Sequence, residues 1–227
     1  MTAATTGPPG VRTYQPRRGR LRPRRREALD RLWPVYGVAL DGGPLAAAGL
    51  FGRAVPLVLE IGSGMGETTA AMAAADPDRG YLAVEVHTPG VANLLRLARA
   101  AGLANLRVAH GDALELLRNR MPPGSLAAIH AFFPDPWPKA RHHKRRLFQP
   151  GHVELLRSRL AGGGALWAAT DWAGYAEAIR AVLAADPELV DPSSGWAPGP
   201  PGRPPTKYER RAREAGRPVY ELVAHRR

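Results

Sequence analysis

Apolar positions along the chain follow two alternating patterns. From residue 55 onward, short runs rich in β-branched and other apolar residues alternate with longer stretches rich in alanine and leucine. The short runs predict strands near 55–61, 81–86, 106–109, 126–133, 165–169 and 219–223. The longer stretches predict helices near 67–75, 90–101, 113–119, 152–160 and 172–184.

This alternation predicts an α/β fold with a doubly wound, mostly parallel sheet and helices on both faces, because parallel strands need right-handed crossovers. In such a sheet, ligands bind at the carboxyl ends of the strands. We expect one domain over 31–227, preceded by a flexible basic arm over 1–30. Six prolines and three glycines at 192–205 predict a loop without helix or strand.

Composition narrows the function classes. A chain of 227 residues with 44% hydrophobic content can fill one core. The sequence has no cysteine, which excludes disulfides, a thiolate nucleophile and a thiolate zinc site, and suggests a cytoplasmic location. No apolar run approaches the ~18 residues that span a bilayer, and the N-terminus lacks the apolar stretch of a secretory signal. We therefore expect no segment that spans a membrane.

The net charge of +12 is concentrated in three segments. Residues 1–26 carry eight Arg and no acid, 139–146 carry five basic residues and no acid, and 203–227 carry eight basic residues against three acids. The rest of the chain is net acidic. An acidic body with cationic appendages favours a nucleic acid partner, with a membrane surface or merely solvated tails as alternatives.

The first predicted strand of the repeat ends in a glycine-rich turn. Glu60 is followed by Gly62, Gly64 and Gly66 in the pattern E-x-G-x-G-x-G, and a helix is expected to follow. Glycine lets the backbone turn sharply and approach a ligand closely. A pyrophosphate disfavours a nearby carboxylate, whereas S-adenosylmethionine is a cation without phosphate. The turn therefore favours a methyl-donor site over a nucleotide site or a turn without ligand.

Two further acids follow the next two predicted strands. Glu85 is placed to accept hydrogen bonds from vicinal ribose hydroxyls, although a carboxylate at a strand end is often only solvated. Asp112 could meet the adenine edge. Asp112 and Glu115 also form a pattern typical of a helix N-terminus, and both roles are compatible because a cap fixes the loop that a ligand touches.

The fourth predicted strand leads into the least ordinary segment of the chain, 132–146, with the sequence FFPDPWPKARHHKRR. Its three alternating prolines fix φ and restrict Asp135 and Trp137. The basic run beside them can grip phosphates, and Trp137 could stack on a base. The alternative is a packed structural loop. A metal site at His142 and His143 is disfavoured because adjacent imidazoles point apart.

The stretch 132–147 resembles the signature of the bacterial tRNA (guanine-N7-)-methyltransferase family. Agreement continues in order along roughly 12–223, in the motifs RGRL at 18–21, EVHTPGV at 85–91, ATDW at 169–172 and TKYE at 206–209. The chain departs from the family at Tyr208, where Phe is more frequent, and at Ala212, where Gly is usual.

The resemblance implies a Rossmann-like class I methyltransferase that uses S-adenosylmethionine and no metal. It places Glu60, Glu85, Asp112 and Asp135 in the methyl-donor pocket, with Asp135 also as the catalytic candidate. The residues that it places against the guanosine are Lys139, Asp171, Thr206, Lys207, Tyr208 and Glu209. Without the resemblance, Asp171 could merely cap the following helix.

The predicted activity is methyl transfer to N7 of guanine 46 in the variable loop of tRNA, with Asp135 acting by positioning and electrostatics. Two alternatives remain at this point: a methyltransferase of the same fold acting on another RNA, such as ribosomal RNA, and a non-enzymatic RNA-binding protein. The sequence leaves open whether the protein is a monomer or a homodimer.

Overall fold

The computed structural model describes residues 11–15, 22–193 and 195–227. Its eight-stranded sheet has the order β1-β4-β3-β2-β5-β6-β8-β7. The strands are β1 (Gly37–Val38), β2 (Leu57–Ile61), β3 (Gly80–Glu85), β4 (Leu106–His110), β5 (Leu126–Phe132), β6 (Leu160–Thr170), β7 (Leu189–Val190) and β8 (Tyr220–Arg226). The pairs from β1 to β6 are parallel, and β8 runs antiparallel to both β6 and β7. The predicted α/β class is confirmed.

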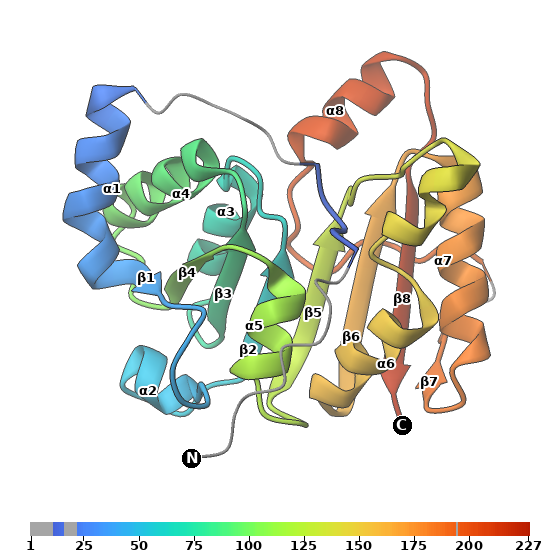
Figure 1. The fold of residues 1–227 in the computed structure, drawn as a ribbon, viewed down its shortest axis with the longest axis horizontal. Coiled ribbons are helices and arrows are strands. Elements are labelled where there is room, and N and C mark those ends of the chain that lie inside the picture. Colours follow the sequence, from blue (N-terminus) through green and yellow to red (C-terminus); the bar gives the residue numbers. More distant parts are fainter. Residues whose placement is uncertain (1–10, 16–21, 194) are drawn as a thin grey trace.

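Helices cover both faces of this sheet (Figure 1). They are α1 (Pro23–Tyr36), α2 (Ala47–Phe51), α3 (Glu67–Ala75), α4 (Thr88–Ala100), α5 (Ala113–Asn119), the 3₁₀ helix η1 (Ala140–Arg145), α6 (Pro150–Arg159), α7 (Ala173–Ala185) and α8 (Lys207–Glu214).

Alternation along β2 divides the core in two. Leu59 points into a cluster with apolar side chains of α5, α6 and α7. Its neighbour Val58 points to the opposite face, into a cluster with α1, α3 and α4. Because successive side chains of a strand point to opposite faces, one buried strand feeds both layers. The burial of all but the last residue of β2 agrees with this position in the centre of the sheet.

The predicted repeat of strands and helices is confirmed, with shifts at several ends. The helices α3 and α5 have the predicted bounds. The strand expected at 165–169 is longer, because β6 begins at Leu160 and continues through the glycines of 162–164. The pattern of apolar positions did not predict α1, α2, α8, η1 or the short strands β1 and β7.

The helix α1 crosses the boundary at residue 30 that we expected between arm and domain. It packs on α4, and its Leu32 and Tyr36 are buried. Residues 1–10 and 16–21 of the arm lie outside the described residues. The segments 191–193 and 195–205 contain no helix or strand.

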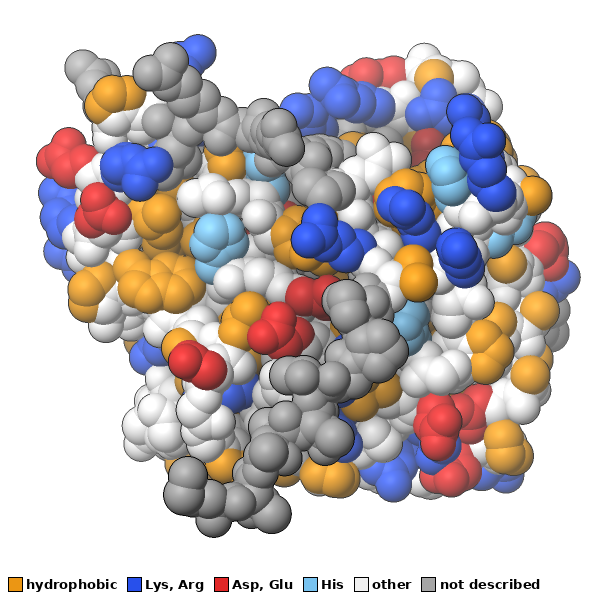
Figure 2. Space-filling view, in the orientation of Figure 1, with side chains coloured by type: hydrophobic (Ala, Val, Ile, Leu, Met, Phe, Trp, Pro, Cys, Tyr) orange, Lys and Arg blue, Asp and Glu red, His pale blue; other side chains and the backbone are white. Residues whose placement is uncertain are grey.

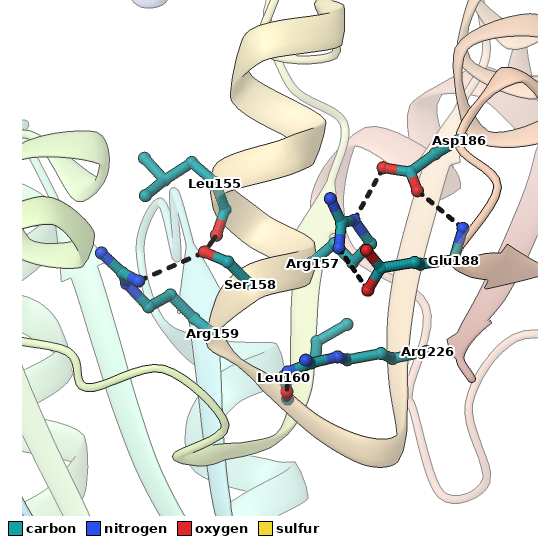
Figure 3. A network of polar contacts seen from close by, with 8 residues as sticks. All are labelled: Leu155, Arg157, Ser158, Arg159, Leu160, Asp186, Glu188 and Arg226. Atoms are coloured by element: carbon teal, nitrogen blue, oxygen red, sulfur yellow. Dashed lines mark hydrogen bonds and ion pairs between the residues drawn. The ribbon is translucent and has the colours of Figure 1, made fainter.

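Polar contacts tie the C-terminal half together (Figure 3). Arg157 of α6 donates through Nε to Asp186 at 2.9 Å, and its Nη1 pairs with Glu188 at 2.5 Å. Near the end of β8, Arg226 donates to the carbonyl oxygen of Leu160. The first two contacts join α6 to the turn after α7, and the third joins β8 to the start of β6. They fix β8 to the parallel part of the sheet.

Within the described residues, no helix is both long and apolar enough to cross a bilayer. In the same part of the chain, no group of three or more His, Asp or Glu side chains is placed to hold a metal ion.

Candidate active site

A pocket of about 330 Å³ opens at the carboxyl ends of the central parallel strands. The arrows of β5 and β6 in Figure 1 point toward this edge of the sheet. The pocket is lined by the glycine turn after β2, the ends of β3 and β5, the start of α5, the segment 13–15 and the start of α8. The predicted residues that line it are Glu60, Gly62, Gly64, Glu85, Asp112, Asp135, Thr206, Lys207 and Tyr208.

The glycine turn is shaped by backbone conformations that side chains resist. Gly62 and Gly64 have φ of 78° and 60°, in the left-handed region, and a Cβ added at either would meet nothing within 4 Å. Gly66 does not line the pocket. Its Cβ would lie 2.6 Å from the Cβ of Leu94 on α4, so glycine is needed there for helix packing.

Glu85 holds the glycine turn in place. Its Oε2 accepts a hydrogen bond of 2.6 Å from the backbone N–H of Gly64, and its Oε1 accepts one of 2.7 Å from that of His87. A carboxylate oxygen has two lone pairs, so both atoms can still accept from a ligand hydroxyl. The carboxylate thus joins the ends of β2 and β3 while it faces the pocket.

Glu60 is a buried acid in the wall of this pocket. It is 4% exposed, and within the described chain its Oε2 has no hydrogen-bond partner. Burial raises the pKa of Glu60 to about 7. The hydroxyl of Ser63 is likewise buried in the pocket wall without a partner among the described residues. Buried, unpaired oxygens are places where a ligand donor is needed.

Asp112 combines the two roles considered from the sequence. Its Oδ1 accepts a hydrogen bond of 2.8 Å from the backbone N–H of Leu114, which caps α5, and the residue lines the pocket. A side-chain oxygen that caps a helix also fixes the turn that carries it. Asp112 is therefore held in position at the pocket wall.

Asp135 sits between two strained backbone positions. Phe133 and Trp137 have φ of 53° and 46°, a region that residues with a Cβ seldom enter. Each such residue costs on the order of 1–3 kcal/mol, and such strain concentrates at functional sites. The backbone N–H of Gln15 donates to Oδ2 of Asp135 at 2.9 Å, and the segment 13–15 lines the pocket beside this carboxylate.

Trp137 anchors this loop and does not offer a ring face to RNA. The residue is 5% exposed, and its indole N–H donates to the carbonyl oxygen of Thr13 at 3.2 Å. Arg145 lies over its ring at 5.0 Å, and His142 meets the ring edge-on at 5.8 Å. The hypothesis that Trp137 stacks on a base is wrong for this conformation, because its surroundings already cover the indole.

Three predicted guanosine contacts do not line the pocket. Lys139 is exposed at the start of η1. Asp171 follows β6 and pairs with Arg217 at 3.0 Å. The cap position of α7 is occupied by Trp172, so the capping alternative for Asp171 is wrong. Glu209 is a buried residue of α8.

Charge separates the pocket from its surroundings. Its acidic lining residues are Glu60, Glu67, Glu85, Asp112 and Asp135, whereas Lys207 is its only lysine or arginine among the described residues. Lys and Arg side chains gather on the upper right of the face in Figure 2, over α8 and the segment that leads into α6. The pocket therefore fits a small cation, and the surface beside it fits a polyanion.

Sequence reasoning missed two parts of this site. The segment 13–15 carries no recognisable motif, and it reaches Asp135 across 120 positions of the chain. The second is Arg203, whose position among prolines and glycines gave no sign that it is buried. The resemblance did indicate the segment next to it, 206–209.

Comparison with known proteins gives consistent matches over most of the chain. A family model described as "Putative methyltransferase" matches residues 54–222. A protein of Streptomyces coelicolor named tRNA (guanine-N(7)-)-methyltransferase is 52% identical over 219 residues, covering 95% of this chain and 81% of that protein. The protein of the same name from Halorhodospira halophila is 51% identical over 219 residues, 95% of each chain.

Solved structures support the fold. A 30S ribosomal A1408 methyltransferase from an uncultured bacterium superimposes with a TM-score of 0.54 at 12% identity, over 79% of this chain and 92% of that one. At this identity, the structural similarity supports the class I methyltransferase fold alone.

Proposed function

The chain belongs to the tRNA (guanine-N(7)-)-methyltransferase family, and from this premise we propose that it transfers the methyl group of S-adenosylmethionine to N7 of guanine 46 in the variable loop of tRNA, giving 7-methylguanosine. The observation that carries the proposal is that a strained loop holds Asp135 in the wall of an acidic pocket. The proposed substrate puts the reaction in the cytoplasm.

The pocket suits S-adenosylmethionine in charge and in shape. The unpaired oxygen of Glu60 and the hydroxyl of Ser63 are available to a cationic ligand, and the open space beside Gly62 and Gly64 admits it close to the backbone. We assign Glu85 to the ribose hydroxyls and Asp112 to the adenine edge. When bound, this cofactor supplies an electrophilic methyl group on a sulfonium.

Guanine N7 needs no general base. Its lone pair lies in the ring plane and carries no proton at neutral pH, so it attacks the methyl carbon directly. The protein must align the nitrogen, the carbon and the leaving sulfur, with the reacting atoms ~3 to 3.5 Å apart. In this mechanism the side chains around the pocket position the base and exclude water.

Asp135 is the residue best placed to favour the transition state. Methylation leaves a positive charge on the purine, and a carboxylate near the ring stabilises that charge as it develops. The same carboxylate can accept hydrogen bonds from N1–H and the N2 amine of guanine, which adenine does not offer in that pattern. Asp135 therefore selects the base and lowers the barrier without taking a proton.

The start of α8 forms the guanosine side of the pocket. Thr206, Lys207 and Tyr208 line it, and the ring of Tyr208 stacks near that of Phe133 at 6.1 Å between centroids. We keep Lys139 and Asp171 as proposed contacts of the nucleotide, reached by the RNA as it enters from the basic side.

N7 is hidden in the deep, narrow major groove of an RNA helix, so the target guanine must be unpaired or displaced. The basic segments beside the pocket would bind phosphates without reading sequence. This division agrees with the charge pattern, in which an anionic pocket holds the cofactor and cationic surface holds the RNA.

The proposal is tested with purified protein, labelled S-adenosylmethionine and unmodified tRNA transcripts. After incubation, borohydride and aniline cut RNA at 7-methylguanosine, so the position of the cut identifies the modified base. We expect label and one cut at guanine 46, and neither in the matched transcript with adenine there. A cut in ribosomal RNA alone supports the alternative acceptor, and the absence of label on any RNA contradicts the proposal.

A further inference from the structure

Glu209 occupies a position that is difficult to reconcile with a direct contact to the substrate. It is 2% exposed and does not line the pocket, although the three residues before it do. Its Oε2 pairs with Nη1 of Arg203 at 2.8 Å, and its Oε1 accepts a hydrogen bond of 2.5 Å from Nη2 of Arg213. Both oxygens therefore face arginines and not the pocket.

Arg203 is the buried arginine of this cluster. Its side chain is 5% exposed, and its guanidinium also pairs with Glu221 of β8, so one cation joins α8 to the sheet. The same guanidinium lies 4.8 Å from the centroid of the Phe132 ring, at the end of β5. Asp135 follows Phe132 by three residues. Arg203 thus contacts both elements that form the guanosine side of the pocket.

The conformation of the proline- and glycine-rich segment 195–205 places Arg203 beside Glu209 and Glu221. A Cβ at Gly199 would lie 3.1 Å from Nε of Arg203 and 3.2 Å from Oε1 of Glu221, tighter than ordinary contacts. The backbone N–H of Ala197 donates to the carbonyl oxygen of Glu221 at 2.9 Å, and that of Arg203 donates to Pro200 at 3.1 Å. The segment therefore closes over β8 and delivers a guanidinium beneath α8.

Glu209 in turn fixes the first turn of α8. Its backbone N–H donates to the hydroxyl of Thr206 at 3.1 Å, which caps the helix. Thr206 and the two residues between them line the pocket. A planar guanidinium that pairs with two carboxylates holds them with more directional precision than an ammonium does. The position of this turn consequently depends on the pair between Arg203 and Glu209.

We propose that Arg203 is a positioning residue for methyl transfer: it sets the first turn of α8 against the end of β5, and Glu209 acts through Arg203 without touching the guanosine. The inference rests on the proposed function for the reaction that the site performs. In this account the proline- and glycine-rich segment 195–205, which carries Arg203, orients the part of the pocket wall that receives the base.

A double-mutant cycle separates this role from direct contact. At saturating tRNA we expect Arg203→Met to lower kcat by about 10²-fold, since misplacement by an ångström can cost that much. Glu209→Gln should lower kcat in the wild-type background but change it less than about threefold in the Arg203→Met background. Should Glu209→Gln cost the same factor in both backgrounds, Glu209 touches substrate directly and the proposal is wrong.

Two further variants serve as a control and as a second background for this cycle. Arg79→Met is the matched control, because it removes a guanidinium that is 48% exposed from its carboxylate partner Asp76, outside the pocket and outside the basic segments. We expect its kcat to stay within about threefold of wild type. Arg203→Lys keeps the buried charge but loses the planar guanidinium that pairs with two carboxylates. It therefore supplies a second background for the cycle if the methionine variant folds poorly.

Hydrogen–deuterium exchange tests positioning without using activity. In Arg203→Met and Arg203→Lys we expect the amides of 207–214 to exchange faster, while those of β2 and β5 keep the wild-type rate. The Arg79→Met protein should match wild type throughout. Unchanged exchange in α8 overturns the role of Arg203. Faster exchange in α8, together with a wild-type protein that methylates no RNA, supports the role and contradicts only the proposed reaction.

Discussion

Asp135 shows how single residues were arranged for chemistry at the expense of local stability. It stands between two left-handed residues, Phe133 and Trp137, and its carboxylate is met by the backbone N–H of Gln15. The indole of Trp137 is buried to hold this loop, with Arg145 over its ring. A carboxylate held this firmly needs little reorganisation when charge develops on the purine.

We expect Asp135→Asn to lower kcat/KM for tRNA by about 10²-fold, because the amide keeps the shape but loses the negative charge that favours the methylated purine. Steady-state transfer of label from S-adenosylmethionine measures it. Asp78→Asn, at an exposed position before β3, is the matched control and should behave as wild type. Activity within threefold of wild type in Asp135→Asn and in Asp135→Ala argues against any role of this carboxylate.

Glu60 predicts a pH-dependent stability. Burial raises its pKa from 4.5 to about 7 in the folded protein, so the folded state retains a proton that the unfolded chain has already lost. The contribution of Glu60 to the free energy of unfolding is therefore fully present below pH 4.5 and is lost as the pH rises from 4.5 through 7. Without cofactor, the stability advantage of Glu60→Gln over wild type should grow by roughly 2 kcal/mol between pH 5 and pH 8.

Urea unfolding of both proteins at the two pH values measures this change. The subtraction removes groups that titrate alike in both proteins. The buried neighbour His130 is uncharged in both folded proteins at pH 5 and at pH 8, because burial lowers its pKa to about 3, so its contribution cancels in the subtraction. A difference between the two proteins that is the same at pH 5 and pH 8 contradicts a raised pKa of Glu60.

At the scale of elements, the sequence predicted those helices and strands whose own pattern is strong. α3 and α5 were placed with their observed bounds because glycines or an acidic cap begin them and alanine or leucine fills them. α1 has no side-chain cap and contains Pro34, so packing on α4 decides its helical state. α8 buries only Glu209 and Ala212, and buried ion pairs replace the apolar stripe that would have revealed it.

The basic helix η1 is the element on which we expect RNA binding to depend most directly. Arg141 and Lys144 are exposed on it, whereas Arg145 and Arg146 hold the loop through Trp137 and the carbonyl oxygen of Pro136. Substitution of the first pair therefore removes charge without disturbing the loop.

Arg141→Gln combined with Lys144→Gln should weaken tRNA binding and reduce the slope of log affinity against log salt by about 1 per lost phosphate contact. Filter binding over a salt series measures both. The matched control removes Arg99 and Arg118, exposed residues in the last turns of α4 and α5. Equal salt slopes for the two double variants would show that η1 does not contact phosphates.

For the whole molecule, charge and chain order predicted more than local motifs did. The net acidic body and its basic segments correspond to an acidic pocket beside a basic surface, and the predicted acids at four strand ends line one cavity. What the sequence could not provide was closure by distant segments. Thr13 to Gln15 reach Asp135, and Arg203 reaches Glu221, through contacts that the order of residues does not encode locally.

The central claim is that this cavity presents a methyl group to the N7 lone pair of a guanine, with no base required. The most direct measurement compares two tRNA transcripts that differ only in 7-deazaguanosine in place of guanosine at position 46, which removes the lone pair but keeps the N1–H and N2 amine. We predict equal binding of the two transcripts, with methyl transfer to the guanosine transcript alone. Equal transfer of label to both would contradict the account, because the methyl group would then have another acceptor.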